Sequence, residues 1–109
     1  MKRGRGGVRY EELEPGLGEV ARKGATVTVK YSIALNRGEV VEDERVASFK
    51  LGERRVIAGL EYGVEGMRVG GRRRLRVGPR LAYREGGVPG KIPSNAVLDI
   101  DLVLLNVST

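Results

Sequence analysis

The sequence has 109 residues, the size of one ordinary domain, and a net charge of +6. We therefore expect a single hydrophobic core and some attraction for anionic partners. Neither cysteine nor histidine occurs, which excludes disulfides, thiolate nucleophiles, histidine-based relays and zinc sites of the Cys/His type. No apolar run approaches the ~20 residues of a membrane span, and no signal-peptide core follows the first residues. We expect no membrane partner and a cytoplasmic location, unless a leader has been removed.

The first part of the chain predicts an arm, a strand and a turn. Residues 1–7, MKRGRGG, show no apolar periodicity and predict a disordered basic arm ahead of a domain over residues 8–109. A short strand is predicted from Val8 to Leu13, and the Pro15-Gly16 pair predicts a turn.

The next segments are also strand-like. Residues 26–35, TVTVKYSIAL, alternate apolar and polar side chains, which predicts a half-buried strand. Residues 36–38 predict a turn, and residues 39–41 resume an extended segment. Residues 44–52, ERVASFKLG, predict a further strand.

The hydrophobic period then changes. Ile57, Leu60, Val64 and Met67 are spaced three, four and three residues apart, which is one face of a helix. Glycines at positions 59 and 63 each weaken this helix by roughly 1 kcal/mol relative to alanine. Packing must therefore stabilise it.

Two more strands enclose a long loop. Residues 72–77, RRRLRV, predict a strand, and residues 78–94 form a loop rich in glycine and proline, of a kind that is usually functional when ordered. Residues 96–107 predict a closing strand whose leucines and isoleucine share one face. The whole order predicts an α+β fold in which an antiparallel sheet is covered on one face by a helix.

The arginine-rich strand could be taken for a nucleic-acid site. Arg72, Arg74 and Arg76 fall on its solvent face, and Asp99 and Asp101 would pair with them if the closing strand is the neighbour. Such exposed pairs contribute only about 0–1 kcal/mol each. A patch that carboxylates half neutralise is a poor phosphate clamp, so we expect no specific nucleic-acid partner and keep nucleic-acid binding as a minor alternative.

Five segments, taken in order, carry a resemblance to a known family: VTVKYSIAL, RGEVVE, FKLG, VIAGLEYGVEGMRVGGRRRL and GPRLAYREGGVPGKIPSNAVLDIDLVLL. They resemble the FKBP-type peptidyl-prolyl cis-trans isomerases, over nearly the whole chain. The resemblance implies an antiparallel sheet of about five strands wrapped around one short helix. It also implies isomerisation of X-Pro bonds without covalent chemistry, cofactor or metal. A water-poor pocket would favour the twisted transition state, which has less charge separation than the planar amide.

The resemblance implies roles for nine positions. It gives the catalytic roles to Tyr31 as a pocket wall, to Ile57 as a backbone N–H that binds a substrate carbonyl, and to Tyr83 as a hydroxyl donor. The substrate-binding positions that it implies are Val41, Glu42, Val56, Leu60, Ile92 and Ile100.

Several of these positions lack the aromatic side chain that the family carries. Leu60 stands in place of a tryptophan, and Val41, Ala47 and Ile100 stand in place of aromatic residues. We therefore expect a wide or shallow pocket, modest isomerase activity on Pro-containing polypeptides, weak macrolide binding and a monomer. The alternative is an FKBP-like binding or chaperone module without useful catalysis.

Overall fold

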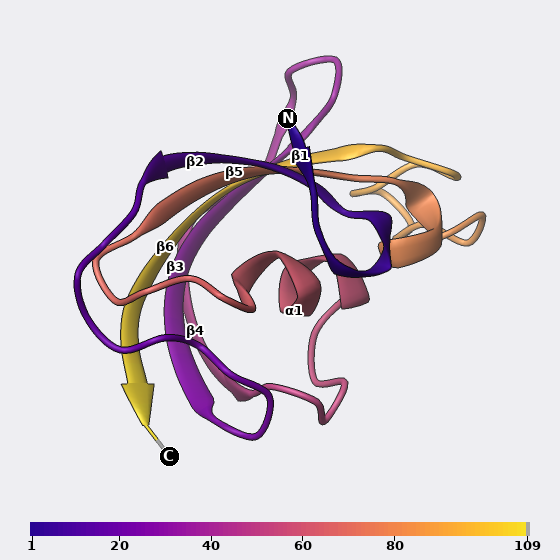
Figure 1. The fold of residues 1–109 in the computed structure, drawn as a ribbon. Coiled ribbons are helices and arrows are strands. Elements are labelled where there is room, and N and C mark those ends of the chain that lie inside the picture. The colour runs from indigo at the N-terminus through magenta and orange to yellow at the C-terminus, as the bar shows by residue number, and fades with distance from the viewer. Residues whose placement is uncertain (109) are drawn as a thin grey trace.

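The computed structural model describes residues 1–108, which form a six-stranded antiparallel sheet bent around a short helix (Figure 1). The sheet order is β1-β2-β5-β6-β3-β4. The strands are β1 Lys2–Arg3, β2 Arg9–Glu14, β3 Thr26–Leu35, β4 Val40–Lys50, β5 Arg72–Val77 and β6 Leu98–Ser108; the helix is α1 Ala58–Val64, and two 3-10 turns are η1 Arg5–Gly7 and η2 Pro79–Leu81. The predicted α+β fold is confirmed, and the strand beyond the expected five is the two-residue β1.

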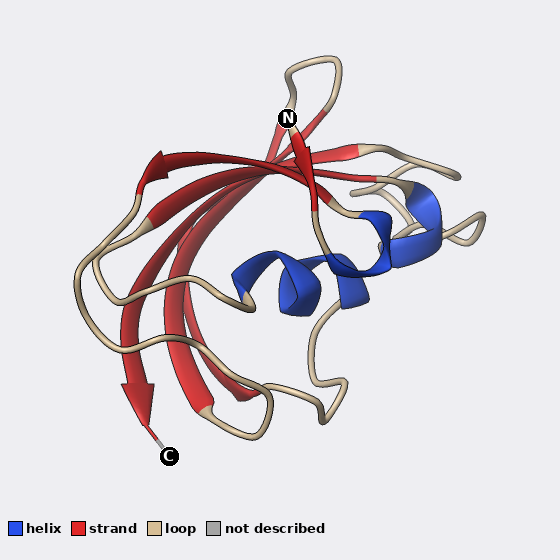
Figure 2. Ribbon diagram, viewed as in Figure 1, coloured by secondary structure: helices blue, strands red, loops and turns tan. Residues whose placement is uncertain are grey.

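The core lies between the concave face of the sheet and the helical segments, which Figure 2 shows on that one side. The alternating residues of β6, Leu98, Ile100, Leu102 and Leu104, are fully buried, as are Val27 and Val29 of β3. The predicted alternation of these strands is therefore confirmed. No helix within residues 1–108 is long and apolar enough to cross a membrane.

Strand β4 is longer than the sequence indicated. It runs without interruption from Val40 to Lys50, where the sequence predicted two separate pieces. Its pairing with β3 shifts register on either side of Ile33, and Glu44 has a φ of +46°. These irregularities behave as a bulge, which bends a strand without ending it, and they bring Glu42 opposite Ile33.

Helix α1 touches β5 through its two glycines. A Cβ on Gly59 would lie 2.3 Å from Val77 Cγ1, and one on Gly63 would lie 2.3 Å from Leu75 Cδ1. The glycines that lower the helix propensity therefore allow the close packing that stabilises the helix.

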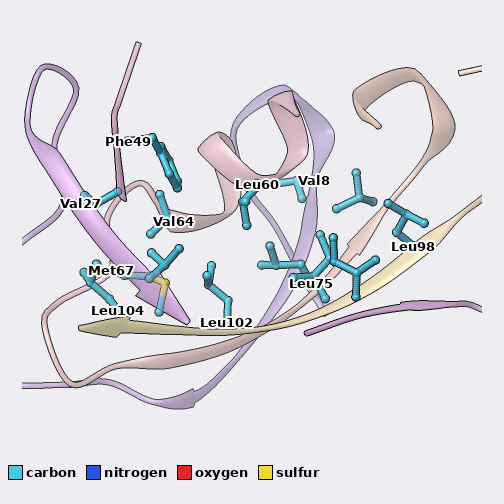
Figure 3. Close-up of a cluster of buried hydrophobic side chains, with 14 of the residues drawn as sticks. Val8, Val27, Phe49, Leu60, Val64, Met67, Leu75, Leu98, Leu102 and Leu104 are labelled. Atoms are coloured by element: carbon cyan, nitrogen blue, oxygen red, sulfur yellow. The ribbon is translucent and has the colours of Figure 1, made fainter. Parts of the chain in front are cut away.

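The helix ends earlier than the hydrophobic spacing predicted. It stops at Val64, and Gly66 turns the chain with a φ of +88°. Met67 therefore reaches the core from the turn after the helix, beside Leu102 and Leu104 (Figure 3).

The first seven residues depart from the disordered arm that the sequence predicted. They form β1 and η1, and β1 pairs with β2. The Gly4 amide donates to the Val8 carbonyl at 2.7 Å, and Gly6, with a φ of +70°, lies against the Tyr62 ring. Backbone hydrogen bonds and a glycine contact order the segment, and neither leaves an apolar pattern in the sequence.

The arginines of β5 lie on both faces of the sheet. Arg72 donates to Asp101 at 2.7 Å and Arg76 to Asp99 at 3.0 Å, so the predicted cross-strand pairs are confirmed. Arg73 points into the protein and is only 8% exposed.

The guanidinium of Arg73 closes the C-terminal end of α1. Its Nη1 donates to the carbonyls of Gly63 and Glu65, each at 3.1 Å. Its Nε binds the Glu12 carboxylate, and its central carbon lies 4.4 Å from the centre of the Tyr10 ring. A cation at this end of a helix is favoured because the unpaired carbonyls carry partial negative charge.

Candidate functional site

Two tyrosines from distant parts of the chain meet at the candidate site. Tyr31 lies on β3 and Tyr83 follows η2, and both are partly buried against the core. Burial raises the pKa of Tyr31 above its usual value. Arg45 lowers this pKa, while the neighbouring Glu42 and Tyr83 add to the increase. The Tyr31 phenol is therefore neutral at physiological pH.

Ile57 lies immediately before the first residue of α1. Its carbonyl accepts hydrogen bonds from the amides of Leu60 and Glu61 at 3.1 and 3.3 Å. Its own amide belongs to the helix start, where N–H groups have no partner one turn earlier. Within residues 1–108 this N–H makes no hydrogen bond. It is thus a backbone donor without a partner in the described part of the chain.

The apolar residues expected at the site belong to one cluster. Leu60, Ile92 and Ile100 are at most 5% exposed, and the partly buried Val41 and Ile57 pack against the same core. Core packing therefore fixes the positions of these side chains. Val56 also packs against this core. In addition it lines a groove that none of the three residues expected to be catalytic lines.

Hydrogen bonds within the loop that follows β5 hold Tyr83 in place. Val88 and Ile92 exchange two backbone hydrogen bonds of 2.8 Å, and the Gly87 amide donates to the Tyr83 carbonyl at 2.9 Å. Gly87 has a φ of +57°, and a Cβ there would lie 2.3 Å from the Ile92 carbonyl oxygen. Only glycine fits this position without displacing Ile92 from the core.

A charged rim adjoins the tyrosines. Glu42 accepts a hydrogen bond from the Lys91 ammonium and a second from Arg45 at 3.2 Å. The Lys91 hydrogen bond lowers the pKa of Glu42. Lys91 therefore ties the loop to β4. Sequence reasoning missed both cations; the only available signals were the Glu42–Arg45 spacing on an exposed strand and the position of Lys91 next to Ile92.

The arrangement suits binding and shape selection better than acid–base or nucleophilic chemistry. It offers a cluster of buried apolar side chains, an amide without a partner and two phenols, and the one carboxylate among the nine expected residues is already paired with two cations. No group of three or more Asp or Glu side chains within residues 1–108 is placed to hold a metal ion.

Comparisons with known proteins point to one family. The family model of the FKBP-type peptidyl-prolyl cis-trans isomerase matches residues 18–105. The chain is 39% identical over 104 residues to FK506-binding protein 4 of Aspergillus oryzae, which covers 93% of this chain and 22% of that protein. It is also 39% identical over 106 residues to the 46 kDa FK506-binding nuclear protein of Spodoptera frugiperda, covering 94% of this chain and 26% of that protein.

Solved structures give the same result for the fold. A peptidyl-prolyl cis-trans isomerase from Pseudomonas syringae pv. tomato superimposes with a TM-score of 0.88 at 27% identity, covering 99% of this chain and 80% of that one. FkpA from Escherichia coli superimposes with a TM-score of 0.86 at 35% identity, covering 98% and 51%. The chain thus spans only 22% and 26% of the length of the two curated relatives.

Proposed function

The chain belongs to the FKBP-type peptidyl-prolyl cis-trans isomerase family, and on that premise we propose that it accelerates X-Pro isomerisation in polypeptides. The observation that carries the proposal is the amide of Ile57, which has no hydrogen-bond partner among the described residues, in a residue that packs with Tyr31 and Tyr83 against the buried apolar core. We further propose that the protein acts as a monomer in the cytoplasm; sedimentation and imaging of a tagged chain test these two points.

The site would act on the conformation of the amide. Resonance sets a barrier of roughly 18–20 kcal/mol to rotation about a peptide bond. A substrate carbonyl held by the Ile57 N–H fixes the pose, and the Tyr83 hydroxyl supplies a second donor. The apolar floor of Leu60 and Ile100 disfavours the planar, charge-separated amide and so favours the twisted transition state.

We propose that turnover is modest and that macrolides bind weakly. Aromatic side chains bury more area than aliphatic ones, and the floor positions Leu60 and Ile100 are aliphatic. This composition also favours the second candidate, a module that binds Pro-containing segments without useful turnover.

A single assay separates the two candidates. Unaided X-Pro isomerisation takes about 10–100 s, so refolding of a proline-limited substrate protein shows a slow phase that an isomerase shortens. We expect micromolar wild-type protein to accelerate this phase. The binding module would leave the rate unchanged, or slow it by retaining the unfolded chain, and that result would reject the enzymatic proposal.

Removing one hydroxyl tests the role of Tyr83. Loss of a single hydrogen bond of about 0.5–1.5 kcal/mol predicts that Tyr83→Phe lowers kcat/KM about 2- to 10-fold. Tyr10→Phe is the matched control, because it removes the same group from a tyrosine that packs on Arg73 outside the site. If the two variants are equally active, the proposed role of the Tyr83 hydroxyl is wrong.

A further inference from the structure

A groove of about 680 Å³ runs along the side of α1 that faces away from β5. Gly59 and Gly63 face β5, whereas Ala58, Glu61 and Tyr62 line the groove. Its other walls come from η1, from the loop before the helix and from the segment around η2, which Figure 1 shows beside the helix. The volume is within the usual range of ligand sites, about 300–1,000 Å³.

The lining of the groove is strongly basic. Five cationic side chains contribute to it: Arg5, Lys23, Arg54, Arg80 and Arg84. Two carboxylates lie among them, and both have partners. Glu65 pairs with Arg5 at 3.0 Å, and the buried Glu61 accepts the amides of Gly52 and Arg54 at 3.1 and 3.0 Å.

The other four cations of the groove have no such partner. Among the described residues, no carboxylate lies within 4.0 Å of the charged nitrogens of Lys23, Arg54, Arg80 or Arg84. The exposed arginines of β5 contrast with them, because Arg72, Arg74 and Arg76 each lie beside a carboxylate. A concave surface focuses the field of its unpaired charges, so the groove attracts anions more strongly than β5 does.

The lining of the groove includes chain neighbours of two residues of the candidate site. Val56 lines the groove and precedes Ile57, and Ala82 and Arg84 line it on either side of Tyr83. A polypeptide whose proline lies on the site therefore has the groove within reach of the residues that flank that proline.

We propose that this groove binds an acidic stretch of the substrate next to the proline, so that the preferred substrates are Pro-containing polypeptides with neighbouring aspartate or glutamate residues. The inference rests on the proposed isomerase function. Arginine is suited to the role because its planar guanidinium matches a carboxylate with two hydrogen bonds. The apolar Val56, Ala58 and Leu81 and the two carboxylates of the lining fit a polypeptide better than a phosphodiester backbone.

The test compares matched peptides. One X-Pro core is flanked on either side by two acidic residues, by their amide counterparts, or by two lysines, and cis/trans exchange is followed by NMR at low salt. We expect kcat/KM for the acidic peptide to exceed that for the amide peptide about tenfold, the effect of one or two exposed ion pairs. Raising the salt to about 0.5 M should remove most of the difference, because charges then interact over a distance of only a few ångströms.

Substitutions locate the preference. The double variant Arg54→Gln/Arg80→Gln removes two groove charges, and Arg3→Gln/Arg9→Gln removes two exposed charges elsewhere. We expect the ratio of acidic to amide peptide to fall toward one in the first variant and to stay at the wild-type value in the second. Circular dichroism confirms that both variants are folded. An equal fall in both variants would assign the preference to net charge and overturn the proposal.

The remaining outcomes are also decisive. If the amide peptide is turned over and the acidic peptide is not preferred, the groove proposal fails while the isomerase proposal stands. If no peptide is turned over, the isomerase proposal itself fails, and the inference fails with it. Binding of a single-stranded oligonucleotide, measured by fluorescence anisotropy, tests whether the groove binds nucleic acid instead of an acidic polypeptide. If the groove variant weakens its binding without changing the peptide ratio, the groove is a nucleic-acid surface and the proposal is wrong.

Discussion

Replacing Arg73 with methionine removes the guanidinium at the end of α1 and keeps most of the apolar stem. The variant leaves the carbonyls of Gly63 and Glu65 without the donor that now lies 3.1 Å from each. It also removes the charge that lies 4.4 Å from the Tyr10 ring centre and the partner of Glu12. Of these losses we expect the hydrogen bond to the Gly63 carbonyl to weigh most, because both Gly63 and Arg73 are buried.

The expected loss of stability follows from these contacts. An acceptor left buried without a partner costs about 1–3 kcal/mol, and a cation–π contact contributes about 0.5–2 kcal/mol. Glu12 is 29% exposed, so water can solvate its carboxylate in the variant. Loss of the ion pair therefore contributes little to the change in stability. We expect the free energy of unfolding to fall by about 2–4 kcal/mol. A domain whose free energy of unfolding is about 5–15 kcal/mol stays folded after such a loss.

Urea denaturation measures the effect, with the slope of the transition checked for two-state behaviour. Arg74→Met is the matched control, since Arg74 is exposed and its nearest carboxylate oxygen is 3.9 Å away. The control should change stability by no more than about 0.5 kcal/mol. If Arg73→Met has an effect as small as the control, the hydrogen bonds to the helix end add nothing net, and the reasoning about Arg73 is wrong.

Three further results are expected. Gly63→Ala should lower the free energy of unfolding by about 1–3 kcal/mol, because its Cβ would overlap Leu75; a gain in urea resistance would mean that helix propensity outweighs packing. Arg72 lowers the pKa of Asp101 below its usual 3.8, so the pair stabilises the fold above that pH and loses its effect as the pH falls through the lowered value. Asp101→Asn should therefore flatten the acid dependence of urea unfolding, and an unchanged curve would contradict this. Burial raises the pKa of Tyr31, so Tyr31→Phe should remove the highest-pH phase of the ultraviolet tyrosine titration.

The sequence predicts much of the sheet because strand alternation is a local pattern. The burial of β3 and β6 and the pairing of Arg72 with Asp101 follow from it directly. The same alternation places Arg73 on the inner face with Leu75. Only the outward arginines were considered from the sequence, so the buried position of Arg73 was not predicted. The order in residues 1–7 could not be predicted, since it depends on backbone hydrogen bonds and a glycine contact.

The candidate site is less predictable than the sheet. Tyr31, Ile57 and Tyr83 were identified through the family motifs, and their spacing alone would have assigned them to the core or a loop. The pairing of Glu42 with Lys91 joins residues 49 positions apart on a strand and a loop. The basic groove likewise combines side chains from four separate segments. No periodic pattern connects such residues, so only the folded chain brings them together.

Of the six strands, β6 is synthesised last, yet it lies between β5 and β3 and joins the two halves of the sheet. While the chain grows on the ribosome, β3 can pair with β4 and β2 with β5, but each half keeps an open edge toward the missing strand. Unpaired edges of this kind are prone to join other chains. A nascent or C-terminally shortened chain is therefore expected to aggregate, whereas one that lacks only β1 leaves the order of the five long strands intact.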